Sequence, residues 1–398
     1  MKTKVLFVIN RLNLGGVEKS LLSLINAMPE ESYDITIGTI NKEGQLLPYV
    51  PERVKVVEIP ELHNGIKNVS KRFIAIKKCL MKGDIKNAFM IPWLSIVSTI
   101  TRTNYPLYRR YMRPGAYSLE EFDIAVMYQG PNEHLEYYVS HVVKARKKMA
   151  WIHFDVDYFF MRKKSVKRSY ANFERVLIVS NQAKANFDRR FPMFAHKSEV
   201  FLNLINKEET IRLGGEPGIF KKHNDKINIA TLGRISWEKG QDKAIYAAKV
   251  LKNKGVKFHW WFIGEGNQSD LYKEKAAAEG VDDCITFTGN AINPYPYLAG
   301  CDVYVQPSRF EGYCIAIGEA KIFGCPIVAS NFMGAHEQLD TVPNSIILPD
   351  TEPETIADAI LKASKMPKIS NVDVGNKADA ARIKEIFAPL MLTPPQSM

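Results

Sequence analysis

The chain contains 398 residues, 46% of them hydrophobic, and its 54 basic and 43 acidic side chains give a formal net charge of +11 at pH 7. This length exceeds what one ordinary core accommodates, so we expect two domains of roughly 150 to 200 residues each. The five cysteines are odd in number and show no Cys-x-x-Cys or Cys/His ligand spacing. They argue against a disulfide framework or a zinc site and favour a reducing, cytoplasmic environment.

The N-terminal stretch MKTKVLFVINRLNLGG predicts a strand and its loop. Two lysines lead directly into a short apolar run, and neither a long apolar core nor a small-residue cleavage site follows. We therefore expect no signal peptide.

Apolar runs alternate with helix-period segments through most of the sequence, which is typical of parallel sheets covered on both faces. In the first half we expect a helix at residues 17–28 and a series of strands, at residues 4–10, 33–40, 55–60, 122–129, 148–154, 175–180 and 199–203. Together these elements predict a first Rossmann-like domain over residues 1–207.

Positive charge is concentrated in an insertion of this domain, at about residues 63–118. From Lys67 to Arg113 eleven basic side chains accompany one acid, Asp84, which is nearly the whole net charge of the protein. The apolar centre of the insertion, residues 88–100, is too short to span a bilayer and contains Pro92. The pattern favours either an anionic membrane surface as partner or a solvated basic helix beside a buried one. Nucleic acid is not expected, because no RNA-binding signature accompanies the charge.

A polar stretch rich in glycine, residues 208–226, predicts a linker. The second domain, residues 227–375, repeats the alternation, with strands expected at 227–232, 258–263, 285–288, 303–306, 326–330 and 345–348. Helices are expected at residues 237–253, 268–279 and 353–364. Residues 376–398 complete the chain with a helix at 378–390 and a tail. Two such series predict two Rossmann-like domains that face one cleft, because ligands of open sheets bind beyond the strand C-termini.

Three strand-end loops carry candidate phosphate-binding groups. Gly15 and Gly16 follow the first strand and let the backbone approach a phosphate closely. In the second half Arg234 and Lys239 lie five residues apart across a turn, so that both cations can converge on a diphosphate. Gly264 follows the next strand. Alone, the glycine pair fits an ordinary tight turn and the two cations fit a surface basic pair. The basic pair and Gly264, in order with the stretch at residues 309–326, indicate one ligand site.

The stretch RFEGYCIAIGEAKIFGCP, residues 309–326, is the most informative. Glu311 is expected on a loop and Glu319 about one turn inside the following helix. A helix N-terminus exposes unpaired amides and the positive end of its dipole, so this segment can hold an anion between two carboxylates that bind hydroxyls. A sugar nucleotide is a ligand of this kind.

The motifs GGVEKS, LGRISWEKG, FIGEG and RFEGYCIAIGEAKIFGCPIVAS, in this order, resemble the retaining glycosyltransferases of family 4, which have the GT-B fold. The resemblance implies transfer of a sugar from a nucleotide diphosphate sugar with retention, without a metal or other cofactor, and a last helix that crosses back to the first domain. UDP, the commonest nucleotide of the family, is expected. Cys314 departs from the small residue of many members and is interpreted as tuning the loop.

The resemblance also implies roles for single residues. Arg234 and Lys239 would hold the diphosphate, Glu311 would contact donor-sugar hydroxyls and Glu319 the ribose. Phosphate oxygens would lie against the backbone amides of the intervening turn, at Gly312, Tyr313, Cys314, Ile315 and Ala316.

At the end of a first-domain strand, His153 matches the histidine that family members place near the donor sugar. Asp155 is interpreted as an acceptor contact or a partner of His153. Residues 155–157 also spell Asp-x-Asp, the metal motif of glycosyltransferases with a different fold, but they follow the wrong type of domain, and we expect no metal.

These residues predict a cytoplasmic hexosyltransferase, either free or peripheral at the inner face of the membrane, that acts on a saccharide or lipid-linked saccharide in cell-surface polysaccharide or glycoconjugate synthesis. The alternatives are a sugar-nucleotide isomerase such as an epimerase, or a sugar-nucleotide-binding protein without activity. The presence of both Glu311 and Arg234 argues against the last.

Overall fold

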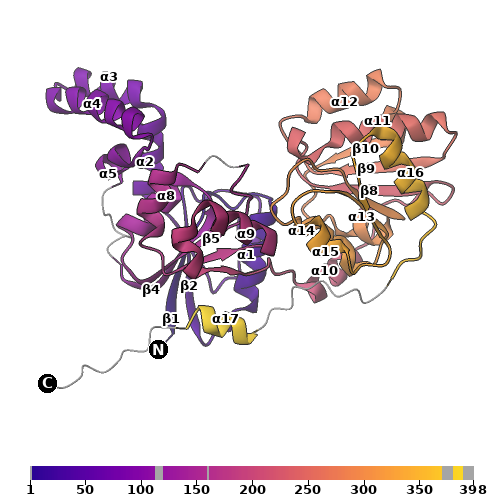
Figure 1. The fold of residues 1–398 in the computed structure, drawn as a ribbon, viewed down its shortest axis with the longest axis horizontal. Helices are drawn as coiled ribbons and strands as arrows, with labels where there is room; N and C mark the ends of the chain where they lie inside the picture. The colour runs from indigo at the N-terminus through magenta and orange to yellow at the C-terminus, as the bar shows by residue number, and fades with distance from the viewer. Residues whose placement is uncertain (1, 113–119, 159–160, 370–379, 389–398) are drawn as a thin grey trace.

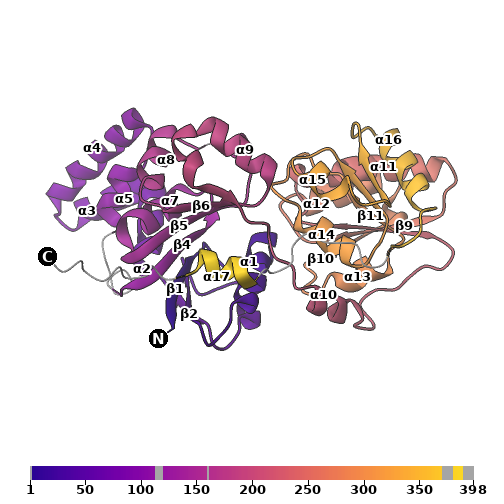
Figure 2. The same cartoon turned by 60° about the horizontal axis from the view of Figure 1, so that its bottom comes forward.

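The computed structural model describes residues 2–112, 120–158, 161–369 and 380–388. These residues form two parallel sheets, each covered by helices on both faces (Figures 1 and 2). The first sheet has seven strands in the order β3-β2-β1-β4-β5-β6-β7, and the second has six in the order β10-β9-β8-β11-β12-β13. The expected α/β architecture with two Rossmann-like domains is thus present.

The strands of the first sheet are β1 (Thr3–Val8), β2 (Tyr33–Thr39), β3 (Lys55–Glu58), β4 (Phe122–Gly130), β5 (Ala145–Ile152), β6 (Arg175–Ile178) and β7 (Ser198–Val200). Its helices are α1 (Gly16–Ala27), α2 (Pro60–Ser70), α3 (Arg72–Met81), α4 (Ile85–Thr101), α5 (Tyr105–Tyr111), α7 (Glu133–Tyr137), α8 (Lys163–Tyr170) and α9 (Asn181–Arg190). The central strands are almost entirely buried, because helices cover both of their faces.

The strands of the second sheet are β8 (Ile227–Leu232), β9 (Phe258–Ile263), β10 (Ile285–Gly289), β11 (Val303–Gln306), β12 (Ile327–Ser330) and β13 (Ser345–Leu348). Its helices are α11 (Gln241–Asn253), α12 (Ser269–Ala278), α13 (Tyr295–Gly300), α14 (Ile315–Ile322), α15 (Ala335–Leu339) and α16 (Pro353–Ala363). Where one helix was expected over residues 237–253, a short 3-10 turn precedes α11, since Gly240 between them adopts a left-handed conformation with φ of 72°.

The stretch expected as a linker begins with a helix, α10 (Lys207–Gly214), which packs beside α13 and α14. Its first turn is capped, because the Asn206 side chain accepts a hydrogen bond from the Glu209 amide. Of the glycines that suggested a linker, Gly214 ends this helix, and Gly215 and Gly218 follow it.

The last described helix, α17 (Ala380–Ile386), lies against the first domain, as expected (Figures 1 and 2). Ile383, Ile386 and Phe387 are buried in the core around β1. The ring of Phe387 lies 5.8 Å from that of Phe7, centroid to centroid. The helix ends at Ile386, earlier than expected, because Phe387 and Ala388 are not helical, and residues 378–379 and 389–390 lie outside the described residues.

The basic insertion forms the helices α2 to α5 between β3 and β4. Helices α3 and α4 make a hairpin at the end of the first domain that lies away from the second domain (Figure 1). Helix α4 continues through Pro92 in the apolar centre of the insertion. Within the described part of the chain, no helix combines the length and the hydropathy needed to span a membrane.

Candidate functional site

The C-terminal ends of β8 and β11 carry the candidate donor-binding residues. These two strands are neighbours in the second sheet. Arg234 follows β8, Glu311 follows β11, and α14 begins at Ile315, four residues after Glu311. Glu319 therefore lies one turn inside α14, which is the arrangement expected from the sequence. The neighbouring strand ends bring the loop, the helix N-terminus and the basic turn together.

Lys239 and Glu311 form a close ion pair. The Lys239 ammonium donates to both oxygens of Glu311, at 2.7 Å each. Ser308 Oγ also donates to Glu311, at 2.7 Å, and Gln306 Nε2 at 3.2 Å. Burial alone would lower the pKa of Lys239, but the Glu311 carboxylate outweighs burial and raises it above its ordinary value. This pair places a permanent cation and an oriented carboxylate side by side.

The side chain of Arg234 is exposed at the same edge. Gln241 Nε2 donates to the Arg234 carbonyl at 2.9 Å, which fixes the backbone of the turn. Arg234 is also close enough to Glu18 of the first domain to influence it. Burial raises the pKa of Glu18 to about 7, and Arg234 opposes this shift. The guanidinium therefore faces the gap between the domains.

Glu319 is buried and contacts both domains. Tyr295 Oη donates to its Oε1 at 3.0 Å. The ammonium of Lys19, on helix α1 of the first domain, lies 3.7 Å from the same oxygen and 5.1 Å from the centre of the Tyr295 ring. The carboxylate expected at the ribose is thus held by an interdomain ion pair.

His153 lies directly after β5, and its amide donates to the Gly130 carbonyl at 2.9 Å. The side chain is buried, and neither ring nitrogen has a hydrogen-bond partner of good geometry within the described residues. Burial lowers the pKa of His153 to about 3, while the Tyr128 backbone and the Asn203 side chain act in the opposite direction. The imidazole is therefore neutral at physiological pH.

The two domains contact each other at Gly312 and Gly16, which lie in two of the loops expected to bind phosphate. A Cβ added to Gly312 would lie 2.0 Å from the His153 carbonyl oxygen, so only glycine fits there. A Cβ on Gly16 would lie 3.4 Å from Ile315 Cδ1. The side chain of Tyr313 packs into the core of the first domain, around β1. The loop that precedes α14 thus packs against His153 and against the first domain near the start of α1.

The remaining candidates of this loop are Cys314, Ile315 and Ala316, at the start of α14. Burial, with a smaller contribution from Glu311, raises the pKa of the Cys314 thiol well above its usual range. A thiol in this state is a poor nucleophile. Gly15 precedes the first turn of α1, with the Glu18 carboxylate beside it. Gly264 has a φ of 141°, and a Cβ there would lie 2.2 Å from the Gly233 carbonyl oxygen, so packing of the strand ends accounts for this glycine.

The Asp-x-Asp triplet is engaged in protein contacts. The Asp155 carboxylate accepts hydrogen bonds from the Asp157 amide, at 2.9 Å, and from Asn186 Nδ2. Asp157 forms ion pairs with Arg189 and Arg190. Across the described residues, no group of three or more acidic, histidine or cysteine side chains has the arrangement of a metal site.

Three side chains of this site were not singled out in the sequence: Glu18, Lys19 and Tyr295. Glu18 and Lys19 belong to the GGVEKS motif, in which only the glycines were interpreted as ligand-binding. The sequence did carry a signal for them, because they form a charged pair in the first turn of a helix that follows a strand-end glycine loop. Tyr295 has no such signal, because it reaches Glu319 from a separate helix, α13.

Comparison with known proteins supports a glycosyltransferase. Residues 216–380 match the family model described as glycosyl transferases group 1. The amylovoran biosynthesis glycosyltransferase AmsK of Erwinia amylovora is 27% identical over 237 residues, which cover 56% of this chain and 54% of AmsK. The chain thus aligns with about half the length of AmsK. An uncharacterized glycosyltransferase of Haemophilus influenzae is 20% identical over 342 residues, covering 85% of this chain and 83% of the relative.

Superposition on solved structures identifies the fold of this chain. The Anabaena protein HepE in complex with UDP-glucose superimposes with a TM-score of 0.65 at 15% identity, over 97% of this chain and 98% of HepE. WaaG, a glycosyltransferase involved in lipopolysaccharide biosynthesis, superimposes with a TM-score of 0.54 at 14% identity, over 96% of this chain and 95% of WaaG. The chain has the GT-B fold, with two Rossmann-like domains.

Proposed function

We propose that the protein is a retaining glycosyltransferase, of the family 4 type, that transfers a hexose from a UDP-sugar to a saccharide or lipid-linked saccharide acceptor. The observation that carries the proposal is the Lys239–Glu311 pair beside Arg234 and the N-terminus of α14. The structural similarity to HepE, which was solved in complex with UDP-glucose, supports the choice of donor. The similarity to AmsK, an amylovoran biosynthesis glycosyltransferase, supports a place in cell-surface polysaccharide synthesis.

In the proposed complex the diphosphate lies against Arg234, Lys239 and the first amides of α14. As the glycosidic bond breaks, negative charge grows on the leaving diphosphate. Cations and amides fixed in advance stabilise that charge more in the transition state than in the ground state. Lys239 then shares its donors between Glu311 and phosphate oxygens, while Glu311 accepts hydrogen bonds from the sugar hydroxyls.

Retention follows from a front-face displacement, in which the departing phosphate oxygen accepts the acceptor proton. The buried, neutral His153 stands opposite Gly312 and orients a donor-sugar hydroxyl. Glu319 accepts from the ribose hydroxyls and keeps its contact with Lys19, so that nucleotide binding favours the apposed domains. Neither step requires a metal ion, in keeping with the Asp155 and Asp157 contacts.

The acceptor side is assigned to the first domain. A cavity of about 210 Å³ opens at the C-terminal end of β4 and is lined by Pro131, Asn132, Glu133, Glu136, Met161, Arg162 and Ser165. Polar side chains of this kind bind saccharide hydroxyls. The basic segment, residues 67–113, would bring the enzyme to an anionic membrane surface where lipid-linked acceptors lie.

A thermal-shift panel of nucleotide diphosphate sugars tests the proposal, with the wild type and Glu319→Ala compared. A ligand that binds only the native state raises the melting temperature. One UDP-sugar should raise it strongly for the wild type and little for Glu319→Ala. Equal stabilisation of both proteins would overturn the ribose assignment, and no stabilisation by any sugar nucleotide would overturn the proposed donor class.

An assay of sugar transfer distinguishes the proposed transferase from an epimerase and from a binding protein without activity. With the sugar nucleotide selected by the panel and a saccharide acceptor, a transferase releases UDP. An epimerase would interconvert the sugar nucleotide without an acceptor, and a binding protein would leave it unchanged.

A further inference from the structure

Helix α4 exposes a continuous apolar stripe. Ile85, Phe89, Trp93, Ile96 and Ile100 follow one another at intervals of four, four, three and four residues, so they lie on one face of the helix. Their exposed fractions range from 53% for Ile96 to 75% for Phe89. The stripe extends over about 22 Å at the rise of an α-helix.

Helix α3 of the same hairpin also exposes apolar side chains. Ile74, Leu80 and Met81 are exposed to 52%, 61% and 78%. Single exposed apolar side chains are ordinary on a protein surface, whereas a set of eight on one helical hairpin marks a contact surface. We call these eight side chains the hairpin patch.

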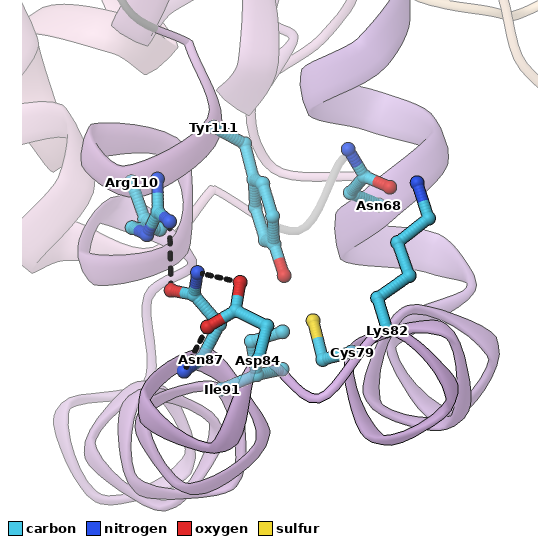
Figure 3. Close-up of a pocket in the computed structure, with 8 residues that line it drawn as sticks. All are labelled: Asn68, Cys79, Lys82, Asp84, Asn87, Ile91, Arg110 and Tyr111. Atoms are coloured by element: carbon cyan, nitrogen blue, oxygen red, sulfur yellow. Dashed lines mark hydrogen bonds between the residues drawn. The ribbon is translucent and has the colours of Figure 1, made fainter.

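The stripe is fixed in its outward orientation. The opposite face of α4 carries the buried residues Ala88, Ile91 and Ser98. Asp84 caps the helix by accepting from the Asn87 amide at 3.2 Å, and Arg110 of α5 donates to Asn87 Oδ1 at 2.7 Å. Asp84, Asn87, Ile91 and Arg110 line a cavity of about 210 Å³ on the inner side of the hairpin, and Figure 3 shows them around it. Rotation of α4 to hide the stripe would break these bonds.

The surroundings of the hairpin patch are basic. Lys77, Lys86 and Arg102 are exposed on α3, on α4 and at the C-terminal cap of α4. Lys82 is also exposed and lines the cavity on the inner side of the hairpin. The one acid of the basic segment, Asp84, is occupied by Asn87 through both carboxylate oxygens. Arg113 lies outside the described residues, and the side chains of Arg72 and Lys78 are not described. An apolar surface with a basic border complements an anionic lipid bilayer, whose phosphates lie above its acyl chains.

We propose that the α3–α4 hairpin is the membrane-docking element, with α4 parallel to an anionic bilayer and Trp93 at the level of the lipid headgroups. This inference deepens the membrane part of the proposed function and rests on it. A second copy of the chain would cover the apolar stripe but would bring two basic borders together. Nucleic acid would pair with the lysines but leave the stripe in water. The hairpin projects away from the second domain, so docking leaves the site around Glu311 accessible (Figure 2).

Co-sedimentation with vesicles tests the inference. The full chain should sediment with vesicles of equimolar phosphatidylcholine and phosphatidylglycerol, and at least tenfold less with vesicles of phosphatidylcholine alone. The variant Phe89→Ser/Trp93→Ser should lose most of this binding. Leu271→Ser/Met193→Ser is the matched control, because Leu271 and Met193 are exposed to 53% and 51% elsewhere on the molecule. This control should bind as the wild type does.

Tryptophan fluorescence reports insertion itself. Anionic vesicles should shift the emission of the wild type to the blue, and Trp93→Phe should bind the vesicles normally but lose most of the shift. Sedimentation of the wild type regardless of lipid charge, or equal binding by the Phe89→Ser/Trp93→Ser variant and its control, would overturn the inference. Dimers that the same variant dissociates, without vesicle binding by the wild type, would assign the patch to a second copy and would also overturn it.

These outcomes are distinguishable from failure of the proposed enzyme. The thermal shift caused by the sugar nucleotide should be the same for the Phe89→Ser/Trp93→Ser variant and the wild type, because the hairpin lies outside the donor site. If the variant loses vesicle binding but keeps the thermal shift caused by the sugar nucleotide, the hairpin acts in membrane binding and not in nucleotide binding. If the wild type binds vesicles but no sugar nucleotide shifts its melting temperature, membrane docking is supported and the proposed donor chemistry is overturned.

Discussion

The ammonium of Lys239 donates to both carboxylate oxygens of Glu311 at 2.7 Å, across the ends of two neighbouring strands. Lys239→Met should reduce kcat/KM for sugar transfer by about 100-fold to 1,000-fold, the cost of removing one preorganised donor to a developing anion. It should also leave Glu311 without its main cation, so that the carboxylate is no longer fixed.

Lys249→Met is the matched control for this prediction. Lys249 forms an ion pair of similar length, 2.6 Å, with Glu279 on the surface of the second domain. Exposed pairs of this kind contribute little, so the control should retain wild-type kcat/KM. Equal losses in the two variants would show that Lys239 acts only on stability.

Lys19 and Glu319 should couple the two domains. Lys19→Met removes the cation nearest to a buried carboxylate, which costs about 1–3 kcal/mol of unfolding free energy. Adding Glu319→Gln removes the charge that was left unpaired, so the double variant should be more stable than Lys19→Met. Urea unfolding of the single and double variants measures this difference. Strictly additive losses would contradict the coupling.

The approach of Gly312 to the His153 carbonyl should be essential for activity. In Gly312→Ala the added Cβ would lie 2.0 Å from that oxygen, so the domains must separate. Transfer should fall at least tenfold, and small-angle X-ray scattering should report a larger radius of gyration. Gly215→Ala, where the nearest atom would lie at 3.4 Å, should leave both unchanged. Wild-type transfer by Gly312→Ala would show that this contact is dispensable.

His153 should make the stability of the protein depend on pH in the acid range. Its pKa is about 3 in the native state and near the ordinary 6.5 in the unfolded chain, so the unfolded chain takes up the proton first as the pH falls. The contribution of the neutral imidazole is complete above pH 6.5 and is lost as the pH falls towards 3. The unfolding free energy of the wild type should therefore fall relative to that of His153→Gln, by up to about 1.4 kcal/mol per pH unit.

Chemical denaturation of the wild type and His153→Gln at several pH values checks the direction of this change in unfolding free energy. Glu18 and Glu136, whose native pKa values of about 7 favour the protonated form, act in the opposite direction in both proteins and cancel in the comparison. A constant difference between the two proteins from pH 6.5 to pH 4 would contradict the burial of a neutral His153.

The sequence predicted the strands of the second domain closely, because each is a short apolar run that helices bury on both faces. Four of its six strands have the expected bounds. It also placed Glu311 before α14 and Glu319 one turn inside it, since these positions depend on local helix chemistry. For the basic segment the sequence left two interpretations open, a membrane-facing apolar surface and a buried helix, because periodicity alone does not show whether an apolar face such as that of α4 is covered.

The contacts between the two domains could not be predicted from the sequence, because they depend on how the domains are placed. Lys19 meets Glu319 only because two separate sheets present their C-terminal edges to each other. Tyr295 reaches the same carboxylate from α13, and Gly312 meets His153 across the same gap. No local pattern encodes such pairings, which depend on the relative placement of two complete domains.

Calorimetric titration of UDP and of uridine into the wild type and Arg234→Met/Lys239→Met tests whether Arg234 and Lys239 bind a diphosphate. Two cations directed at a diphosphate should make the wild type bind UDP at least 100-fold more tightly than uridine, a difference of about 2.7 kcal/mol. In the double variant this preference should fall below tenfold. Equal affinities of the wild type for UDP and uridine would contradict a diphosphate site at Arg234 and Lys239.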